Sequence, residues 1–66
     1  MGENFNMTMR KFLKQVGVTS QQAIEAAMRQ AGGDATSGKE FTAKMVLTID
    51  AIDLEHVVEG KISGLE

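Results

Sequence analysis

Cysteine, proline, tryptophan and tyrosine are all absent from this 66-residue sequence, and its only aromatic residues are three phenylalanines. Without cysteine, the chain has neither a disulfide framework nor a thiolate metal site. A chain of this length buries only about 60% of the surface that it exposes when unfolded, which allows one small core. A deep cavity lined by several catalytic side chains is therefore not expected.

Catalytic groups are also scarce. His56 is the only histidine and hence the only ordinary base for nucleophilic catalysis. Its position in a strand pattern favours a partly buried histidine at the edge of the core over a catalytic or metal-binding role. Asp50, Asp53 and Glu55 lie near one turn, but the spacing of a calcium-binding loop is missing. We expect no enzyme activity, no cofactor and no metal site.

Charge is modest and unevenly distributed. The net charge is −2, which argues against a protein whose main task is to neutralise phosphates. Residues 1–31 carry four cations against two acids, whereas residues 32–66 carry three cations against seven acids. No apolar run reaches the roughly 18 residues of a membrane span, and no secretory signal opens the chain. We therefore expect a cytoplasmic protein with no membrane contact.

The first half of the chain has helical periodicity. Gly17 is a natural helix stop, and Thr19 with Gln22 fits a capping box that starts a new helix. We therefore predict two helices, over about 5–16 and 20–31. The apolar side of the first helix consists of Phe5, Met9, Phe12, Leu13 and Val16, with Arg10, Lys11 and Lys14 opposite.

Residues 32–39 predict a flexible linker, because they are rich in glycine and small polar residues. Residues 33–39 also fit G-x-x-x-x-G-K, the start of the phosphate-loop pattern, but Glu40 stands where a serine or threonine is required. A phosphate loop runs from strand to helix, whereas this segment is predicted to run from helix to strand. Nucleotide binding is therefore disfavoured.

After the linker the hydrophobic period changes from 3.6 to 2, which predicts strands over about 40–49 and 54–62. We expect the register in which the numbers of paired residues sum to 103. In this register one face of the hairpin is almost entirely apolar, and Lys44 opposes Glu59 on the other face. The connection 50–53 lacks the glycine or asparagine that a tight two-residue hairpin turn prefers. We expect a wider four-residue turn or a bulge there.

These elements predict an α+β fold with the order helix, helix, strand, strand. Both helices are expected to pack on the apolar face of a C-terminal antiparallel hairpin, forming one small domain over residues 1–66.

The leading functional interpretation is a non-enzymatic interaction protein. A lone hairpin leaves two unpaired strand edges, which favour an unknown protein partner or a second copy of the chain, with a homodimer preferred. Val46 and Val57 on the outer sheet face suit such a contact. The candidate interaction surface therefore comprises Arg10, Lys11, Lys14, Val46 and Val57.

The alternative is a nucleic-acid-binding module, in which the two helices form a helix-turn-helix-like pair and the hairpin a wing. The predicted second helix offers one cation, Arg29, offset by one acid, Glu25, so few donors would reach a DNA groove. A solvated basic face is favoured over nucleic-acid contact.

The two ends of the chain also carry a family resemblance. The motifs are Asn6-Met7, Arg10-Lys11-Phe12-Leu13-Lys14, Val16-Gly17-Val18-Thr19-Ser20-Gln21 and His56-Val57-Val58-Glu59-Gly60. With them, the chain resembles a family of short bacterial proteins catalogued only as a domain of unknown function. The resemblance implies a stand-alone bacterial protein with no assigned activity, so it implies no functional residues.

Overall fold

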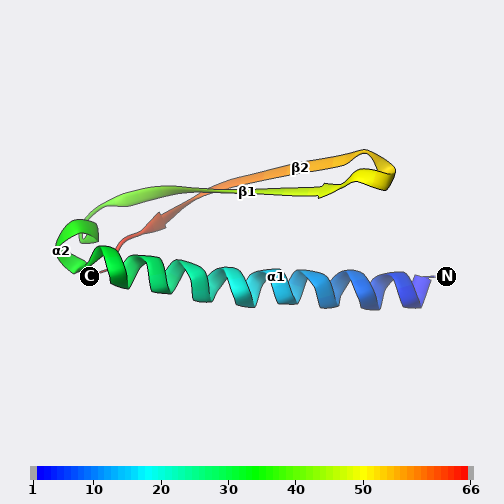
Figure 1. Ribbon diagram of the computed structural model, residues 1–66, viewed down its shortest axis with the longest axis horizontal. Coiled ribbons are helices and arrows are strands. Elements are labelled where there is room, and N and C mark those ends of the chain that lie inside the picture. Colours follow the sequence, from blue (N-terminus) through cyan, green and yellow to red (C-terminus); the bar gives the residue numbers. More distant parts are fainter. Residues whose placement is uncertain (1, 66) are drawn as a thin grey trace. The chain divides into compact units, whose positions relative to one another are not determined.

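The computed structural model describes residues 2–65 (Figure 1). The predicted α+β class and the order helix, helix, strand, strand are confirmed. The described residues divide into two compact units after Gln30, and each unit is described by itself below. Packing of the helices on the hairpin and a single-domain organisation stay predictions. The elements are helix α1 (Gly2–Ala31), helix α2 (Gly33–Thr36), strand β1 (Glu40–Ile49), the 3-10 turn η1 (Asp50–Ile52) and strand β2 (Leu54–Ser63).

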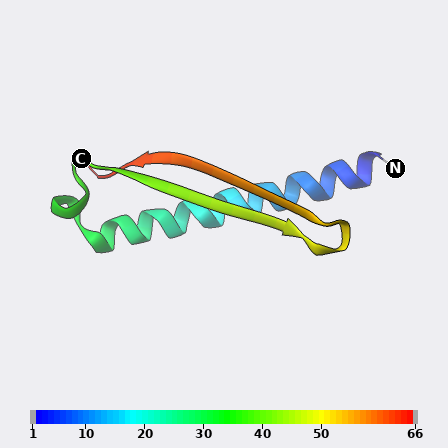
Figure 2. The same cartoon turned by 90° about the horizontal axis from the view of Figure 1, so that it is seen from above.

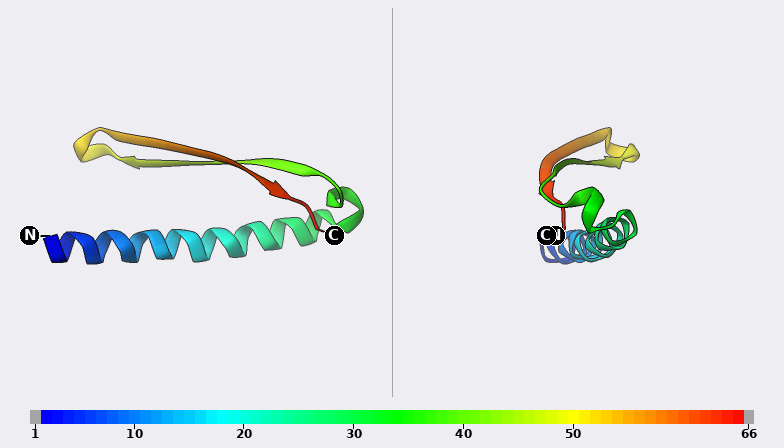
Figure 3. Two further views of the ribbon diagram at one scale, coloured as in Figure 1. Left: turned by 180° about the vertical axis from the view of Figure 1, so that it is seen from behind. Right: turned by 90° about the vertical axis from the view of Figure 1, so that its left-hand side faces the viewer.

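Helix α1 runs without a break through the segment where the sequence predicts a turn, as Figure 3 shows. The expected division into helices 5–16 and 20–31 is therefore wrong. The Thr19 hydroxyl does not cap a new helix, because it donates to the carbonyl of Gln15, one turn earlier, at 2.9 Å. Gly17 keeps an ordinary helical φ. A glycine inside a helix costs about 1 kcal/mol relative to alanine, whereas a break would leave four N–H and four C=O groups without helical partners.

Gly32, with φ 92°, ends the long helix, because this backbone conformation is open mainly to glycine. The single-turn helix α2 follows inside the segment predicted to be a flexible linker, so that prediction also needs correction. The backbone N–H of Thr36 donates to Gly32 at 3.2 Å, and the N–H of Lys39 donates to Thr36 at 3.1 Å. These turn hydrogen bonds give the segment a defined path into β1.

Strands β1 and β2 form a two-stranded antiparallel sheet, visible along its length in Figure 2. The predicted register is confirmed, from Glu40 opposite Ser63 to Ile49 opposite Leu54. The predicted four-residue connection is also confirmed. It closes with the N–H of Asp53 donating to the carbonyl of Asp50 at 3.1 Å, and Asp53 takes a left-handed φ of 53°. Aspartate tolerates this conformation better than most residues.

No apolar side chain among residues 2–65 is fully buried, and Thr36 is the only residue in this range that is. The side chains of the predicted inner sheet face are half-buried or exposed. His56, expected to be partly buried on that face, is exposed. The physical reason lies in each unit by itself: one helix or one two-stranded sheet has no second layer to cover its apolar side.

Candidate interaction surface

The three cations predicted for an interaction surface, Arg10, Lys11 and Lys14, are all exposed on α1. Successive residues advance by about 100° around a helix, so the three side chains share the side opposite Phe5 and Val16. The helix therefore presents a basic side and an apolar side to its surroundings.

The two predicted valines lie directly opposite each other in the sheet register. Val46 is 50% exposed and Val57 is 44% exposed. The rest of this sheet face is polar, and on it the amine of Lys61 donates to the Thr42 hydroxyl at 2.7 Å. The valine pair is thus a small apolar patch within a polar face. The cations and the valines belong to different units, so the structure does not define one site made by all five residues.

Sequence reasoning assigned the larger apolar surfaces to a core, and within its own unit each of these surfaces has no covering layer. On α1, Phe5 is 62% exposed and Phe12 is 52% exposed. On the hairpin, the face opposite the valine pair exposes Met45, Ile49, Leu54 and Val58. Contiguous exposed apolar surface marks interaction sites. The signal for these surfaces was present in the sequence as hydrophobic periodicity, but the same periodicity is typical of a buried core.

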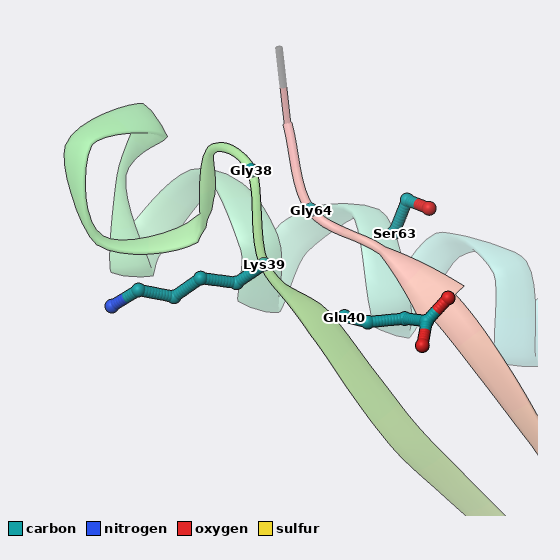
Figure 4. Close-up of a pocket in the computed structure, with 5 residues that line it drawn as sticks. All are labelled: Gly38, Lys39, Glu40, Ser63 and Gly64. Carbon is teal, nitrogen blue, oxygen red and sulfur yellow. The ribbon is translucent and has the colours of Figure 1, made fainter.

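A recess of about 350 Å³ lies where the strands meet the preceding loop. Figure 4 shows that the amine of Lys39 and the carboxylate of Glu40 extend in opposite directions, so the charges do not converge on a ligand. Glu40 begins strand β1, which leaves the phosphate-loop-like segment without the following helix that would face an anion. The recess is lined by Gly38, Lys39, Glu40, Ser63 and Gly64.

A second recess, of about 440 Å³, adjoins the hairpin turn and includes Asp50, Asp53 and Glu55. Across residues 2–65, no three histidine, cysteine, aspartate or glutamate side chains come together in a group that could hold a metal ion. The acidic side chains at the turn therefore give no metal-site geometry.

Within residues 2–65, no helix combines the length and the apolar character that a membrane crossing requires.

Comparison with known proteins agrees with the resemblance seen in the motifs. Neither the curated proteins nor the solved structures include a significant match to the chain. The model of DUF6494, a family of unknown function, matches residues 1–65. The chain therefore belongs to the DUF6494 family.

Proposed function

We propose that the protein is a non-enzymatic interaction protein of the cytoplasm and that it works as a homodimer. One observation carries the proposal. Fifteen large apolar side chains are exposed among residues 2–65, and no apolar side chain in that range is fully buried. An interaction partner would cover this surface, whereas a catalytic role would need convergent reactive groups.

The low stability expected of each unit alone also favours association. An isolated helix and an isolated two-stranded hairpin are both marginal in water. Burial of apolar surface stabilises by about 25 cal/mol for each Å², so association is the natural source of the missing stability. A second copy is a partner that is always present, and a two-fold interface uses every contact twice.

The hairpin supplies a further reason to expect association. Among residues 2–65 each strand is paired with another strand on one side only, which leaves the backbone donors and acceptors of both outer edges without a strand partner. Such edges accept an additional strand from a partner. The exposed pair Val46 and Val57 adds apolar contact near these edges.

The nucleic-acid alternative requires a helix-turn-helix pair, but α1 is one continuous helix with no turn between residues 17 and 19. The cations on the basic side remain. Salt-dependent binding to duplex DNA, abolished by Lys11→Glu combined with Lys14→Glu, would favour this alternative over the proposed function.

Sedimentation equilibrium tests the proposal directly. We expect a molar mass of twice the chain's 7.1 kDa at micromolar concentration. A mass of one chain at the highest soluble concentration would refute the homodimer.

A further inference from the structure

We propose that the apolar side of α1 binds α1 of a second copy in antiparallel orientation, with the two-fold axis at Val16. This inference deepens the proposed function and rests on it. It also depends on the continuity of α1 from Gly2 to Ala31, because two separate helices would not share one long apolar side.

An apolar stripe, called the α1 stripe here, follows the whole helix. All six charged residues of α1 lie about 100° or more around the helix from the stripe's centre, at 100° per residue. Pairing two stripes would therefore bury no charge. The α1 stripe consists of Phe5, Met9, Phe12, Leu13, Val16, Ser20, Ala23, Ile24, Ala27 and Ala31.

Side-chain size changes along the α1 stripe, and this change sets the orientation. The N-terminal half carries large side chains, whereas most positions of the C-terminal half are alanine or serine. An antiparallel pair with residue numbers summing to 32 sets three large side chains of the stripe level with small ones, and Val16 with its own copy. Interdigitated large and small residues fill space at the density of protein interiors. The level pairs are Phe5 with Ala27, Met9 with Ala23, and Phe12 with Ser20.

A parallel pair would not achieve this fit. It would set phenylalanine against phenylalanine at one end and alanine against alanine at the other, so the helices would splay. It would also bring the Arg10, Lys11 and Lys14 regions of the two copies to the same end, whereas the antiparallel pair separates them.

The helix bounds fit the same register. Val16 lies at the middle of Gly2–Ala31, so the two helices overlap along almost their full length. At 1.5 Å per residue, this overlap is about 45 Å long. A phenylalanine side chain buries about 200 Å², so the exposed parts of Phe5 and Phe12 in two copies would bury roughly 450 Å². Specific interfaces typically bury at least about 1,200 Å². The interface therefore requires the whole stripe and not the phenylalanines alone.

The hairpin's apolar face is the competing cover for the α1 stripe. That face holds His56 opposite Leu47 and a shallow position where Ala43 faces Gly60. If the hairpin covered the stripe, the imidazole of His56 would lose its water and the contact at Ala43 and Gly60 would leave a gap. A second copy of α1 brings neither an imidazole nor such an alanine–glycine pair to the stripe.

Because the chain contains no cysteine, single-cysteine variants can report the orientation. The variants are Val16→Cys, Met9→Cys, Ala23→Cys and, on the basic side, the control Lys14→Cys. Each is incubated in a glutathione redox buffer and analysed on a non-reducing gel. Met9→Cys is also mixed with a size-tagged Ala23→Cys chain. Circular dichroism checks that each variant keeps its helix.

We expect Val16→Cys to form disulfide dimers, because copies of residue 16 would lie within the 4.4–6.8 Å Cα separation of a disulfide. We expect the mixture to cross-link between Met9→Cys and Ala23→Cys. Met9→Cys alone should not self-link, since its copies would be about 21 Å apart along the helices. Lys14→Cys should not link either.

Three outcomes would overturn the inference. Self-linking of Met9→Cys as efficient as that of Val16→Cys would indicate a parallel pair. Absence of links at Val16 and between residues 9 and 23, in a chain that sediments as a dimer, would exclude this helix pair and leave the proposed function intact. A wild-type chain that sediments as a monomer would refute the proposed function itself.

Discussion

Thr36 joins the two ends of the hairpin unit through its side chain. Its hydroxyl donates to the carbonyl of Gly32 at 3.0 Å and accepts from the N–H of Leu65 at 3.1 Å. The N–H of Gly64 also donates to the carbonyl of Lys39 at 2.9 Å. With 2% of its surface exposed, Thr36 forms a small polar closure at the base of the hairpin.

Replacing Thr36 with valine should destabilise the hairpin unit by about 1–3 kcal/mol, because two partly buried hydrogen bonds of its hydroxyl are lost at nearly constant side-chain size. Urea unfolding followed by circular dichroism measures the loss. Thr36→Ser keeps the hydroxyl and should retain most of the stability. A larger loss in Thr36→Ser than in Thr36→Val would show that the methyl group, not the hydroxyl, matters.

Gly64 lies so close to this closure that a side chain there would collide with it. A Cβ atom on Gly64 would fall on the carbonyl oxygen of Thr36, whereas a Cβ on Gly60 would meet nothing within 4 Å. We expect Gly64→Ala to lower the free energy of unfolding by about 1–3 kcal/mol. The matched Gly60→Ala variant should be neutral within about 1 kcal/mol. Thermal melts that leave Gly64→Ala unchanged would contradict this packing.

Little of this residue-scale detail was predictable. Nothing in the composition of residues 32–39 distinguishes Thr36 from Ser37, because the closure depends on a contact with residues almost 30 positions later. The four-residue turn was predictable, since Ala51 and Ile52 rarely adopt the positive φ of a tight hairpin turn. His56 was predicted on the correct sheet face but with the wrong exposure, because alternation identifies a face and not what covers it.

At the scale of elements, the continuity of α1 separates the structure most clearly from the sequence prediction. Gly17→Ala tests it. In a continuous helix this variant should gain about 0.5–1 kcal/mol, because alanine has the higher helix propensity and a Cβ there meets nothing within 4 Å. Gly38→Ala, at φ 72°, should instead destabilise. A loss of stability in Gly17→Ala, measured by urea unfolding, would indicate that residue 17 needs the positive φ of a turn.

The α1 stripe can be tested by adding a charge. Ala23→Glu should raise the dimer dissociation constant by about 100-fold or more, because an unpaired carboxylate would enter an apolar interface. Gln21→Glu adds the same group on the charged side of the helix and should leave the constant within about threefold. Sedimentation measures both. Equal behaviour of the two variants would exclude the stripe as the interface.

The strands were more predictable than the helices for a physical reason. Strand alternation on two segments restricts the hairpin to one register, in which Lys44 meets Glu59 and the apolar residues share a face. The helix prediction relied on local signals, Gly17 and the Thr19 capping box, which the continuous hydrogen bonding of α1 overrides. Val46 and Val57 lie opposite each other as the register predicts, and their role in a contact stays a prediction. What covers the α1 stripe stays a prediction, because periodicity alone does not reveal the covering layer.

At the scale of the whole molecule, the proposed function makes folding and association one process. Each unit has an apolar side and no second layer of its own, so association would supply much of the stability. A homodimer of this kind has a stability that depends on its concentration, whereas a chain that covers its own apolar surface does not.

The concentration dependence of urea unfolding tests this coupling most directly. Circular dichroism would follow the unfolding midpoint across a hundredfold range of protein concentration. A folded dimer predicts a midpoint that rises with concentration, equivalent to about 1.4 kcal/mol for each tenfold increase. A midpoint that stays constant over the whole range would contradict it.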